Sequence, residues 1–346
     1  MTTHRYDLAS DNTAGICPEA WAALAAANAE AVASYGDDRW TQRVFDLVRE
    51  IFETDCESFF VFNGTAANSL ALAQLGRSYH SVVCHEYSHI ASDECGGPEF
   101  FSGGSKLLPT PGANGKLDLA EVAATLAKQR DLHSPKPRVL SVTQSTELGT
   151  VYTRDEIGAI TAFARAREMF VHMDGARFAN AVAALDCSPK EITWQAGVDV
   201  LTFGGTKNGT GGGEVVVFFK KELAAEFDYR AKQAGQLASK MRFIAAPWAG
   251  LLSDGTWLAN ARRANASAEM LARKLADIAS LRPAFPREVN AIFLHLPETL
   301  VRQLHERGWH FYKFIEPDVY RLMCSWAMDA RVIDDFVSDV KAITTD

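Results

Sequence analysis

The chain has 346 residues, of which 47% are hydrophobic and 23% are charged. This composition excludes disordered and collagen-like chains, and six cysteines are too few for a disulfide scaffold. With 43 acidic and 35 basic residues, the formal net charge of -8 argues against a protein that binds a nucleic-acid backbone or an anionic membrane.

The N-terminal region lacks the apolar stretch of a signal peptide, and no window approaches the ~20 apolar residues of a membrane span. The cysteines form no CxxC pair and lie in or beside apolar stretches, as reduced core thiols do. We therefore expect a cytoplasmic protein whose cysteines form neither a zinc site nor a redox site.

Apolar stretches alternate with amphipathic ones, which predicts a largely parallel sheet covered by helices on both faces. The predicted strands lie in FFVFNG (residues 59–64), RVLSVTQ (138–144), MFVHMDG (169–175), VDVLTFGG (198–205) and EVVVFF (214–219). A helix is predicted to begin after Thr153, because Glu156 three residues later completes a capping box. The pattern indicates an α/β fold.

The pattern of apolar and polar residues changes after the last of these strands. An Ala-rich helix is predicted over residues 256–279, and a βαββα pattern follows it. We therefore expect a large domain over residues 1–250, including an N-terminal arm, and a smaller C-terminal α+β domain over residues 251–346.

Ligands of open α/β sheets bind outside the carboxyl ends of the strands, and three such ends carry polar residues. The first strand leads into Gly64-Thr65-Ala66-Ala67-Asn68, where a helix begins. Free backbone N–H groups at a helix N-terminus suit a phosphate. The alternative is an ordinary strand-to-helix turn in which Thr65 caps the helix.

The other two ends carry Asp174, with Arg177 three residues later, and Lys207, which follows Gly204-Gly205-Thr206. An aspartate at such a place is often a helix cap, and a lysine in a glycine-rich bend is often simply solvated. Together with the phosphate cup, however, these residues match the needs of pyridoxal 5'-phosphate. The lysine forms the Schiff base, the aspartate keeps the pyridine nitrogen protonated, and the helix N-terminus takes the phosphate.

The sequence resembles the low-specificity L-threonine aldolases, pyridoxal-phosphate enzymes of fold type I, over nearly its whole length. The motifs that carry the resemblance are Ser10-Asp11-Asn12-Thr13, Tyr35-Gly36-Asp37-Asp38, Asn63 to Asn68, His85 to Ile90, His172 to Arg177, Lys207 and Arg321. The chain departs from many members at Gln144-Ser145, where those read Glu-Asn. We expect this difference to affect the substrate preference and not the binding of the cofactor.

The resemblance implies roles residue by residue. It assigns catalytic roles to Lys207, His89, His133 and Asp174. It assigns cofactor binding to Gly64, Thr65, Asn68, His89, Asp174, Arg177, Thr206 and Lys207. It assigns substrate binding to Ser10, Tyr35, Arg177 and Arg321, with Tyr35 contributed by a neighbouring subunit. No metal ion is implied.

The implied reaction is retro-aldol cleavage of L-threonine or L-allo-threonine to glycine and acetaldehyde, in a homotetramer built as a dimer of dimers with shared active sites. A base must accept the proton of the β-hydroxyl group, and a histidine suits this task near neutral pH. His89 and His133 are both candidates. We also expect one basic residue of the polar segment after the sheet to contact the phosphate. The sequence does not distinguish between Lys232, Lys240 and Arg242 for this role.

Other functions compete with this one. Within the same fold the alternatives are a phenylserine aldolase and a β-eliminating amino-acid lyase. The stretch from His85 to His89 also matches the H-E-x-x-H signature of zinc proteases, with Glu86 as the base. That motif must lie on a helix, whereas residues 81–84 read as a strand and Gly96-Gly97-Pro98 follows closely. A nicotinamide-dependent dehydrogenase would need a G-x-G-x-x-G turn, which the first strand lacks.

Overall fold

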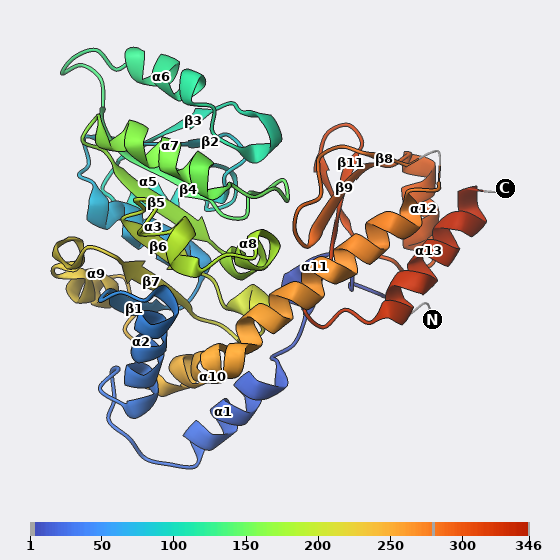
Figure 1. Cartoon of the computed structure of the whole chain (residues 1–346), viewed down its shortest axis with the longest axis horizontal. Coiled ribbons are helices and arrows are strands. Elements are labelled where there is room, and N and C mark those ends of the chain that lie inside the picture. Colours follow the sequence, from blue (N-terminus) through green and yellow to red (C-terminus); the bar gives the residue numbers. More distant parts are fainter. Residues whose placement is uncertain (1–3, 279–280, 345–346) are drawn as a thin grey trace.

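The computed structural model describes residues 4–278 and 281–344 and contains two sheets of different size (Figure 1). The large sheet has seven strands in the order β1-β7-β6-β5-β4-β2-β3. Its strands are β1 (Glu57–Val61), β2 (His80–His85), β3 (Lys106–Thr110), β4 (Lys136–Thr143), β5 (Phe170–Gly175), β6 (Val200–Phe203) and β7 (Glu214–Phe218). The α/β fold with a mainly parallel sheet is confirmed.

One strand of the large sheet runs against the others. β7 pairs antiparallel with both β6 and β1, whereas β2 to β6 pair in parallel. The reason lies in the connection, because residues 204–213 between β6 and β7 are too few for the helical crossover that parallel strands need. This short connection is the glycine-rich segment that contains Lys207.

Helices cover both faces of the large sheet (Figure 1). On one face, α3 (Gly64–Leu75) and α9 (Phe227–Gln233) pack in an apolar core with the strands. The helices of the other face are α1 (Pro18–Asn28), α2 (Arg39–Phe52), α6 (Leu119–Ala127), α7 (Arg154–Arg165), α8 (Phe178–Leu185) and α10 (Arg242–Leu252). The short helices α4 (His89–Ser92) and α5 (Gly97–Phe101) follow β2. The capping box of Thr153 and Glu156 at α7 is confirmed.

The small sheet is antiparallel, in the order β10-β11-β9-β8. Its strands are β8 (Arg282–Pro283), β9 (Ala291–His295), β10 (Tyr312–Ile315) and β11 (Val319–Met323). They pack with α11 (Thr256–Leu275), α12 (Glu298–Glu306) and α13 (Ala330–Thr344) around an apolar core of their own. The βαββα pattern is therefore present, with β8 as an additional strand. The predicted end of the Ala-rich helix at residue 279 lies outside the described residues.

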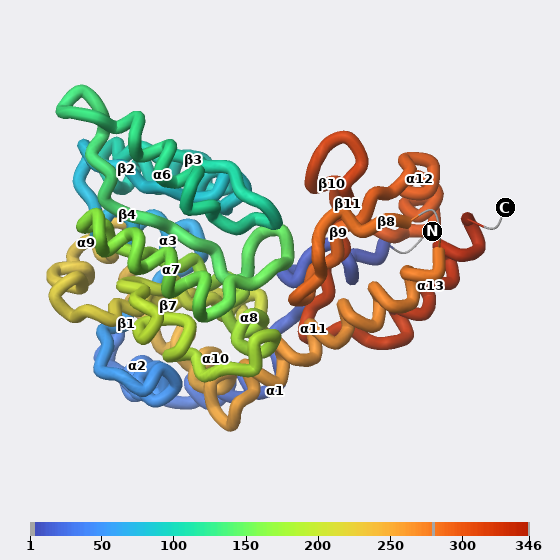
Figure 2. The backbone as a smooth tube through the Cα atoms, turned by 45° about the horizontal axis from the view of Figure 1, so that its top comes forward, coloured from blue at the N-terminus to red at the C-terminus, as the bar shows by residue number. Residues whose placement is uncertain are grey.

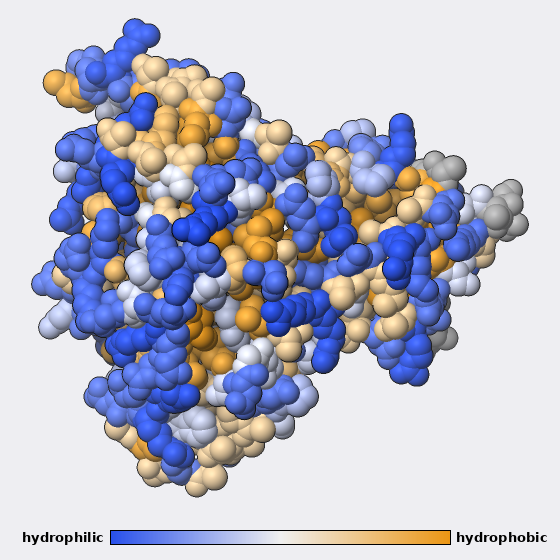
Figure 3. Space-filling view, in the orientation of Figure 1, coloured by the Kyte–Doolittle hydropathy of each residue, from blue (hydrophilic) through white to orange (hydrophobic). Residues whose placement is uncertain are grey.

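Two segments connect the large and small sheets. Helix α11 extends from the side of α10 to the small sheet, and the N-terminal segment returns along β9 and β11 (Figure 2). The amide of Met323 in β11 donates to the carbonyl of Leu8, and Arg5 forms a bridge with Trp309. In the space-filling view, hydrophilic side chains cover most of the visible rim and hydrophobic ones gather toward the middle (Figure 3).

Two properties expected from the sequence concern the chain as a whole. All six cysteines are unpaired, and all but Cys95 and Cys187 are buried. Cys95 is exposed, in the turn before α5, and therefore is not the core thiol that the sequence predicts. None of the helices in residues 4–278 and 281–344 combines the length and the hydropathy that a bilayer span requires.

Candidate active site

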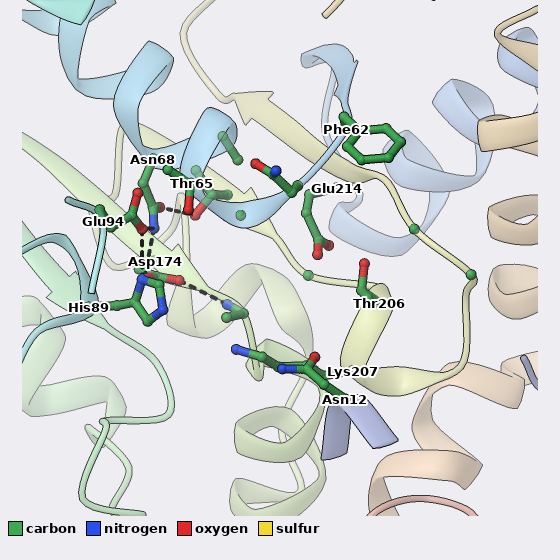
Figure 4. Close-up of a pocket in the computed structure, with 18 residues that line it drawn as sticks. Asn12, Phe62, Thr65, Asn68, His89, Glu94, Asp174, Thr206, Lys207 and Glu214 are labelled. Atoms are coloured by element: carbon green, nitrogen blue, oxygen red, sulfur yellow. Dashed lines mark hydrogen bonds and ion pairs between the residues drawn. The ribbon is translucent and has the colours of Figure 1, made fainter. Parts of the chain in front are cut away.

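A cavity of about 340 Å³ lies at the carboxyl ends of β5 and β6, below the N-terminus of α3 (Figure 4). This is the sheet edge at which the sequence predicts the site. The predicted residues that line the cavity are Gly64, Thr65, Asn68, His89, Asp174, Thr206 and Lys207. These residues are far apart in the sequence, and the topology of the sheet brings them together.

The N-terminus of α3 offers free amide groups to the cavity. The side chain of Asn63 caps the helix by accepting a hydrogen bond from the amide of Ala66 at 2.9 Å. The amides of Gly64 and Thr65 donate to none of the described residues and face the cavity. Unpaired amides at a helix N-terminus carry partial positive charge and bind anions. Asn63, and not Thr65, is therefore the cap, which leaves Thr65 available to a phosphate.

Asp174 is held rigidly with one face toward the cavity. In β5, Met173 packs into the core on the side of α7, so that Asp174 points to the other face, toward α3. Its Oδ1 accepts from the amide of Ala176 at 3.0 Å, and its Oδ2 accepts from Asn68 Nδ2 at 2.9 Å. Asn68 in turn accepts from Thr202 Oγ1 at 2.8 Å. A buried and oriented carboxylate of this kind fits the protonated nitrogen of a pyridine ring.

His89 is oriented by a carboxylate that the sequence analysis does not assign. Its Nδ1 donates to Oε1 of Glu94 at 2.8 Å, and the Glu94 side chain has 0% exposure. The same oxygen of Glu94 accepts from Asn68 Nδ2 at 2.9 Å. The hydrogen bond to Glu94 raises the pKa of His89, and burial opposes this effect without cancelling it. Figure 4 shows the imidazole beside Asp174 at the cavity wall.

Lys207 lies in a tight turn that glycines make possible. A Cβ at Gly205 would lie 2.4 Å from the ring of Trp248, and one at Gly204 would lie 2.5 Å from the carbonyl oxygen of Ala176. Only residues without a Cβ allow this close packing. The turn therefore has a fixed position against α10, and Lys207 extends from it into the cavity toward Asp174 (Figure 4).

Two arginines approach each other, one from the start of α8 and one from the small sheet. Arg177, at the start of α8, is buried and forms a two-point ion pair with Asp11. Arg321 belongs to β11 of the small sheet, and its Nε is buried without a partner among the described residues. Burial lowers the pKa of Arg321, and the positive charge of Arg177 lowers it further. Ser10 lies next to Asp11 and accepts a hydrogen bond from the amide of Asn12 at 3.2 Å.

Five of the predicted site residues do not line this cavity: Ser10, Arg177, Arg321, His133 and Tyr35. His133 is exposed in the loop that precedes β4, whereas the site lies beyond the opposite end of that strand. Eight residues of strand, Lys136–Thr143, separate the two edges by about 25 Å. The prediction that His133 acts near the substrate is therefore wrong for a site formed by one chain. Tyr35 is 49% exposed and has the Lys232 ammonium group 5.0 Å from its ring centroid.

The H-E-x-x-H stretch is not on one helix. His85 ends β2 and His89 begins α4, so their side chains do not share a helix face. His85 Nε2 lies 2.9 Å from the carbonyl oxygen of Gly112, and its Nδ1 accepts from the amide of Tyr87 at 3.1 Å. Within the described part of the chain, no group of three or more histidine, cysteine, aspartate or glutamate residues has an arrangement that could hold a metal ion.

The sequence analysis misses three carboxylates at the site. Asp11 stands inside a motif that carries the resemblance, but nothing in the sequence pairs it with Arg177. Glu94 follows His89 by five residues, a spacing with no general meaning outside a helix. Glu214 opens the apolar strand EVVVFF, and a lone charge in front of such a strand was a usable signal.

The chain is similar to known proteins over nearly its whole length. The family model for beta-eliminating lyases matches residues 7–299. A low specificity L-threonine aldolase of Pseudomonas aeruginosa is 54% identical over 343 residues, which cover 99% of each chain. Another, from Pseudomonas sp., is 53% identical over the same length. The solved structure of a Leishmania major threonine aldolase has 26% identity and a TM-score of 0.92, covering 97% of this chain and 98% of that one.

These matches extend over both sheets and over the motifs that build the cavity. The residues at the cavity also fit pyridoxal 5'-phosphate, because free amides, a buried carboxylate and a lysine face the same space. The chain belongs to the beta-eliminating lyase family and, within it, to the low-specificity L-threonine aldolases, which depend on pyridoxal 5'-phosphate.

Proposed function

We propose that this enzyme cleaves L-threonine and L-allo-threonine, and related β-hydroxy-α-amino acids, to glycine and the corresponding aldehyde. The observation that carries the proposal is the common cavity of Lys207, Asp174 and the free amides of α3. The 54% identity to a low specificity L-threonine aldolase supports the same reaction. A phenylserine aldolase and a β-eliminating lyase remain the alternatives that the experiment below separates.

Pyridoxal 5'-phosphate supplies an aldehyde that combines with amines and a ring that withdraws electrons. In our proposal, Lys207 Nζ holds the aldehyde carbon, and Asp174 accepts the hydrogen bond of the ring nitrogen. The amides of Gly64 and Thr65 and the hydroxyl of Thr206 bind the phosphate. Asn68 fixes the orientation of Asp174, because its Nδ2 donates to Oδ2 at 2.9 Å.

Arg177 and Arg321 are proposed to bind the carboxylate of the substrate. Asp11 occupies Nε and Nη2 of Arg177, and Nη1 donates to none of the described residues. The buried Nε of Arg321 likewise has no acceptor among the described residues. A carboxylate between two guanidinium groups satisfies them, and it holds the amino acid in one orientation. Ser10, beside Asp11, is proposed as a further donor.

His89 is proposed as the base that accepts the proton of the β-hydroxyl group. Its side chain is 32% exposed and lies at the cavity wall, where Glu94 fixes Nδ1 and leaves Nε2 free for the substrate. When the cofactor is bound, His89 would also contact its ring, since it lines the same cavity as Asp174 and Lys207. For His133 and Tyr35 we propose a role only as residues of a neighbouring subunit, because His133 precedes β4 at the opposite edge of the sheet and Tyr35 is 49% exposed.

We also propose that the enzyme is a homo-oligomer with shared sites, a dimer of dimers. Phe62 lines the cavity and is 64% exposed, so it offers an apolar contact to a neighbouring subunit beside the site. The division into residues 1–250 and 251–346 is likewise a proposal, supported by the two sheets and their separate cores. The cytoplasmic location stays a prediction. Light scattering of the purified enzyme tests the assembly.

The test of the function starts with the visible absorption spectrum of the purified enzyme. Reduction with borohydride and peptide mass mapping should place the cofactor on Lys207, and an adduct on another lysine would overturn the assignment. The enzyme is then incubated with L-threonine, L-allo-threonine, phenylserine and L-serine. Release of acetaldehyde from the first two supports the proposal. Benzaldehyde from phenylserine alone identifies a phenylserine aldolase, and pyruvate and ammonia from serine identify an eliminating lyase.

A further inference from the structure

A third carboxylate of the cavity, that of Glu214, lies at the end where the phosphate is proposed to bind. Glu214 is the first residue of β7, is 9% exposed and lines the same cavity as Gly64, Thr65 and Thr206. Figure 4 shows its carboxylate pointing into the cavity beside Thr206. The proposed reaction assigns no role to this buried acid, although it lies among the groups that should bind a phosphate.

Glu214 holds the turn that precedes Lys207. Its Oε2 accepts a hydrogen bond from the amide of Gly205 at 2.6 Å. The amide and the hydroxyl of the next residue, Thr206, also act on the carboxylate and lower its pKa. These contacts join the start of β7 to the end of β6 across the glycine-rich segment. Glu214 is therefore a positioning residue for Thr206 and Lys207, and its charge state decides which partner the Thr206 hydroxyl serves.

The charges around Glu214 are few. Lys207 is the charged group that acts on it from the turn, and Gly64 and Thr65 at the start of α3 are uncharged. The residues of α10 that pack on the glycine-rich segment are Ile244 and Trp248. Val61 of β1 is its partner across the sheet. Burial raises the pKa of Glu214, although its hydrogen bonds and Lys207 act in the opposite direction.

A phosphate dianion and a carboxylate in one buried cavity repel each other strongly, because little water screens them. The repulsion disappears if the carboxylate takes a proton from solvent. The neutral acid can then donate to Thr206 Oγ1, which leaves the Thr206 hydroxyl hydrogen for a phosphate oxygen. The amide of Gly205 keeps its acceptor, because the carbonyl oxygen of the neutral acid still accepts.

We propose that Glu214 takes up one proton when the phosphate group of the cofactor enters the cavity, and that it thereby couples retention of the cofactor to pH. The inference rests on the proposed binding of pyridoxal 5'-phosphate in this cavity. It predicts that the phosphate group itself, and not the aldehyde or the ring, is the source of the proton uptake. Pyridoxal, which lacks the phosphate, is therefore the matched ligand.

The first test uses the unmodified enzyme after removal of its cofactor. Titration calorimetry at pH 8, in buffers of different ionisation enthalpy, gives the number of protons taken up per ligand bound. Pyridoxal 5'-phosphate should take up about one proton more than pyridoxal. Equal proton uptake for the two ligands would overturn the proposal. Failure of both ligands to bind would instead contradict the proposed cofactor, so the two failures are distinguishable.

The second test compares Glu214→Gln with Glu222→Gln, an exposed control in the turn after β7. Glutamine imitates the neutral acid and keeps an acceptor for Gly205. The affinity of the wild type for pyridoxal 5'-phosphate should fall about tenfold per pH unit above the pKa of Glu214, relative to pyridoxal. Glu214→Gln should lose this dependence and bind more tightly at pH 9, and the control should keep it. A dependence on pH that survives in Glu214→Gln contradicts the proposal. Melting temperatures of the cofactor-free variants establish that both fold.

Discussion

Asp11 and Arg177 form a buried ion pair in which Nε of Arg177 lies 2.7 Å from Oδ2 of Asp11 and Nη2 lies 2.9 Å from Oδ1. Asn290 donates to the same carboxylate at 3.1 Å. The pair joins the N-terminal arm to the helix after β5, and Asn290 joins both to the small-sheet part of the chain. An arginine held at two nitrogens cannot change its direction, so its third nitrogen is preorganised for a substrate carboxylate.

Asp11→Asn should therefore damage both stability and substrate binding. Removing one partner of a buried ion pair leaves an uncompensated charge and costs about 3–5 kcal/mol of the free energy of unfolding. We also expect the KM for L-threonine to rise, because the freed guanidinium loses its orientation. Urea unfolding and initial rates measure the two effects. Asp7→Asn, in the same arm with a 3.8 Å contact to Arg5, is the control and should change little. An unchanged KM in Asp11→Asn would contradict the role of the pair in binding.

The same pair predicts how stability depends on acid. Burial raises the pKa of Asp11, but Arg177 outweighs it and the pKa falls to about 2. A carboxyl group whose pKa is lower in the folded state stabilises the fold above its unfolded value near 3.8 and loses that contribution as the pH falls toward 2. The shift corresponds to about 2 kcal/mol. The difference in unfolding free energy between the wild type and Asp11→Asn should thus shrink from pH 5 to pH 3, and a constant difference would be inconsistent with the lowered pKa.

Asp174 and Lys207 were accessible to prediction because each follows an apolar strand directly, and the ends of parallel strands meet at one edge. The phosphate site at Gly64 and Thr65 could be predicted for the same reason. The contacts of Asp11, Glu94 and Glu214 could not, because no spacing in the sequence encodes them. For Glu214 the only signal was a lone charge in front of an apolar strand. His133 shows the converse limit: a resemblance assigns a role, whereas only the direction of β4 shows that its loop lies at the far edge.

Asp174→Asn tests the partner of the ring nitrogen. Asparagine keeps the shape of the side chain and can accept one of the two hydrogen bonds that Asp174 receives, from the amide of Ala176 or from Asn68. It cannot stabilise a protonated pyridine by charge. A hydrogen bond to a charged group contributes about 1.5–3 kcal/mol, which corresponds to a loss of kcat of about 10- to 100-fold. The visible spectrum of the bound cofactor should change as well. Asp186→Asn, whose parent side chain is 90% exposed, is the control. Full activity in Asp174→Asn would exclude the assigned role.

Glu94→Gln tests whether Glu94 sets the properties of His89. The hydrogen bond to the Glu94 carboxylate is the main cause of the raised pKa of His89, so a neutral amide acceptor in its place should lower that pKa. The limb of the pH–rate profile that reports His89 then moves to lower pH, and NMR titration of the imidazole follows the same shift. Glu147 and Asp174 also act on His89 by charge and are unchanged in this variant. Glu86→Gln, an exposed carboxylate close in the sequence, should leave the profile as it is. A profile in Glu94→Gln identical to the wild type would assign Glu94 a structural role alone.

Arg321 separates binding from stability more sharply than any other residue of the site. Its Nε is buried without a partner and Arg177 repels it, so in the absence of substrate the guanidinium destabilises the fold. Arg321→Ala should therefore keep or raise the melting temperature while the KM for L-threonine rises. Arg321→Lys keeps the charge but loses the planar fork, and its KM should rise by about 10- to 100-fold. Arg302→Ala, on the exposed face of α12, is the control for both measurements. If Arg321→Ala lowered the melting temperature and left the KM unchanged, Arg321 would be a residue of the fold, and the carboxylate of the substrate would have to be bound by Arg177 without it.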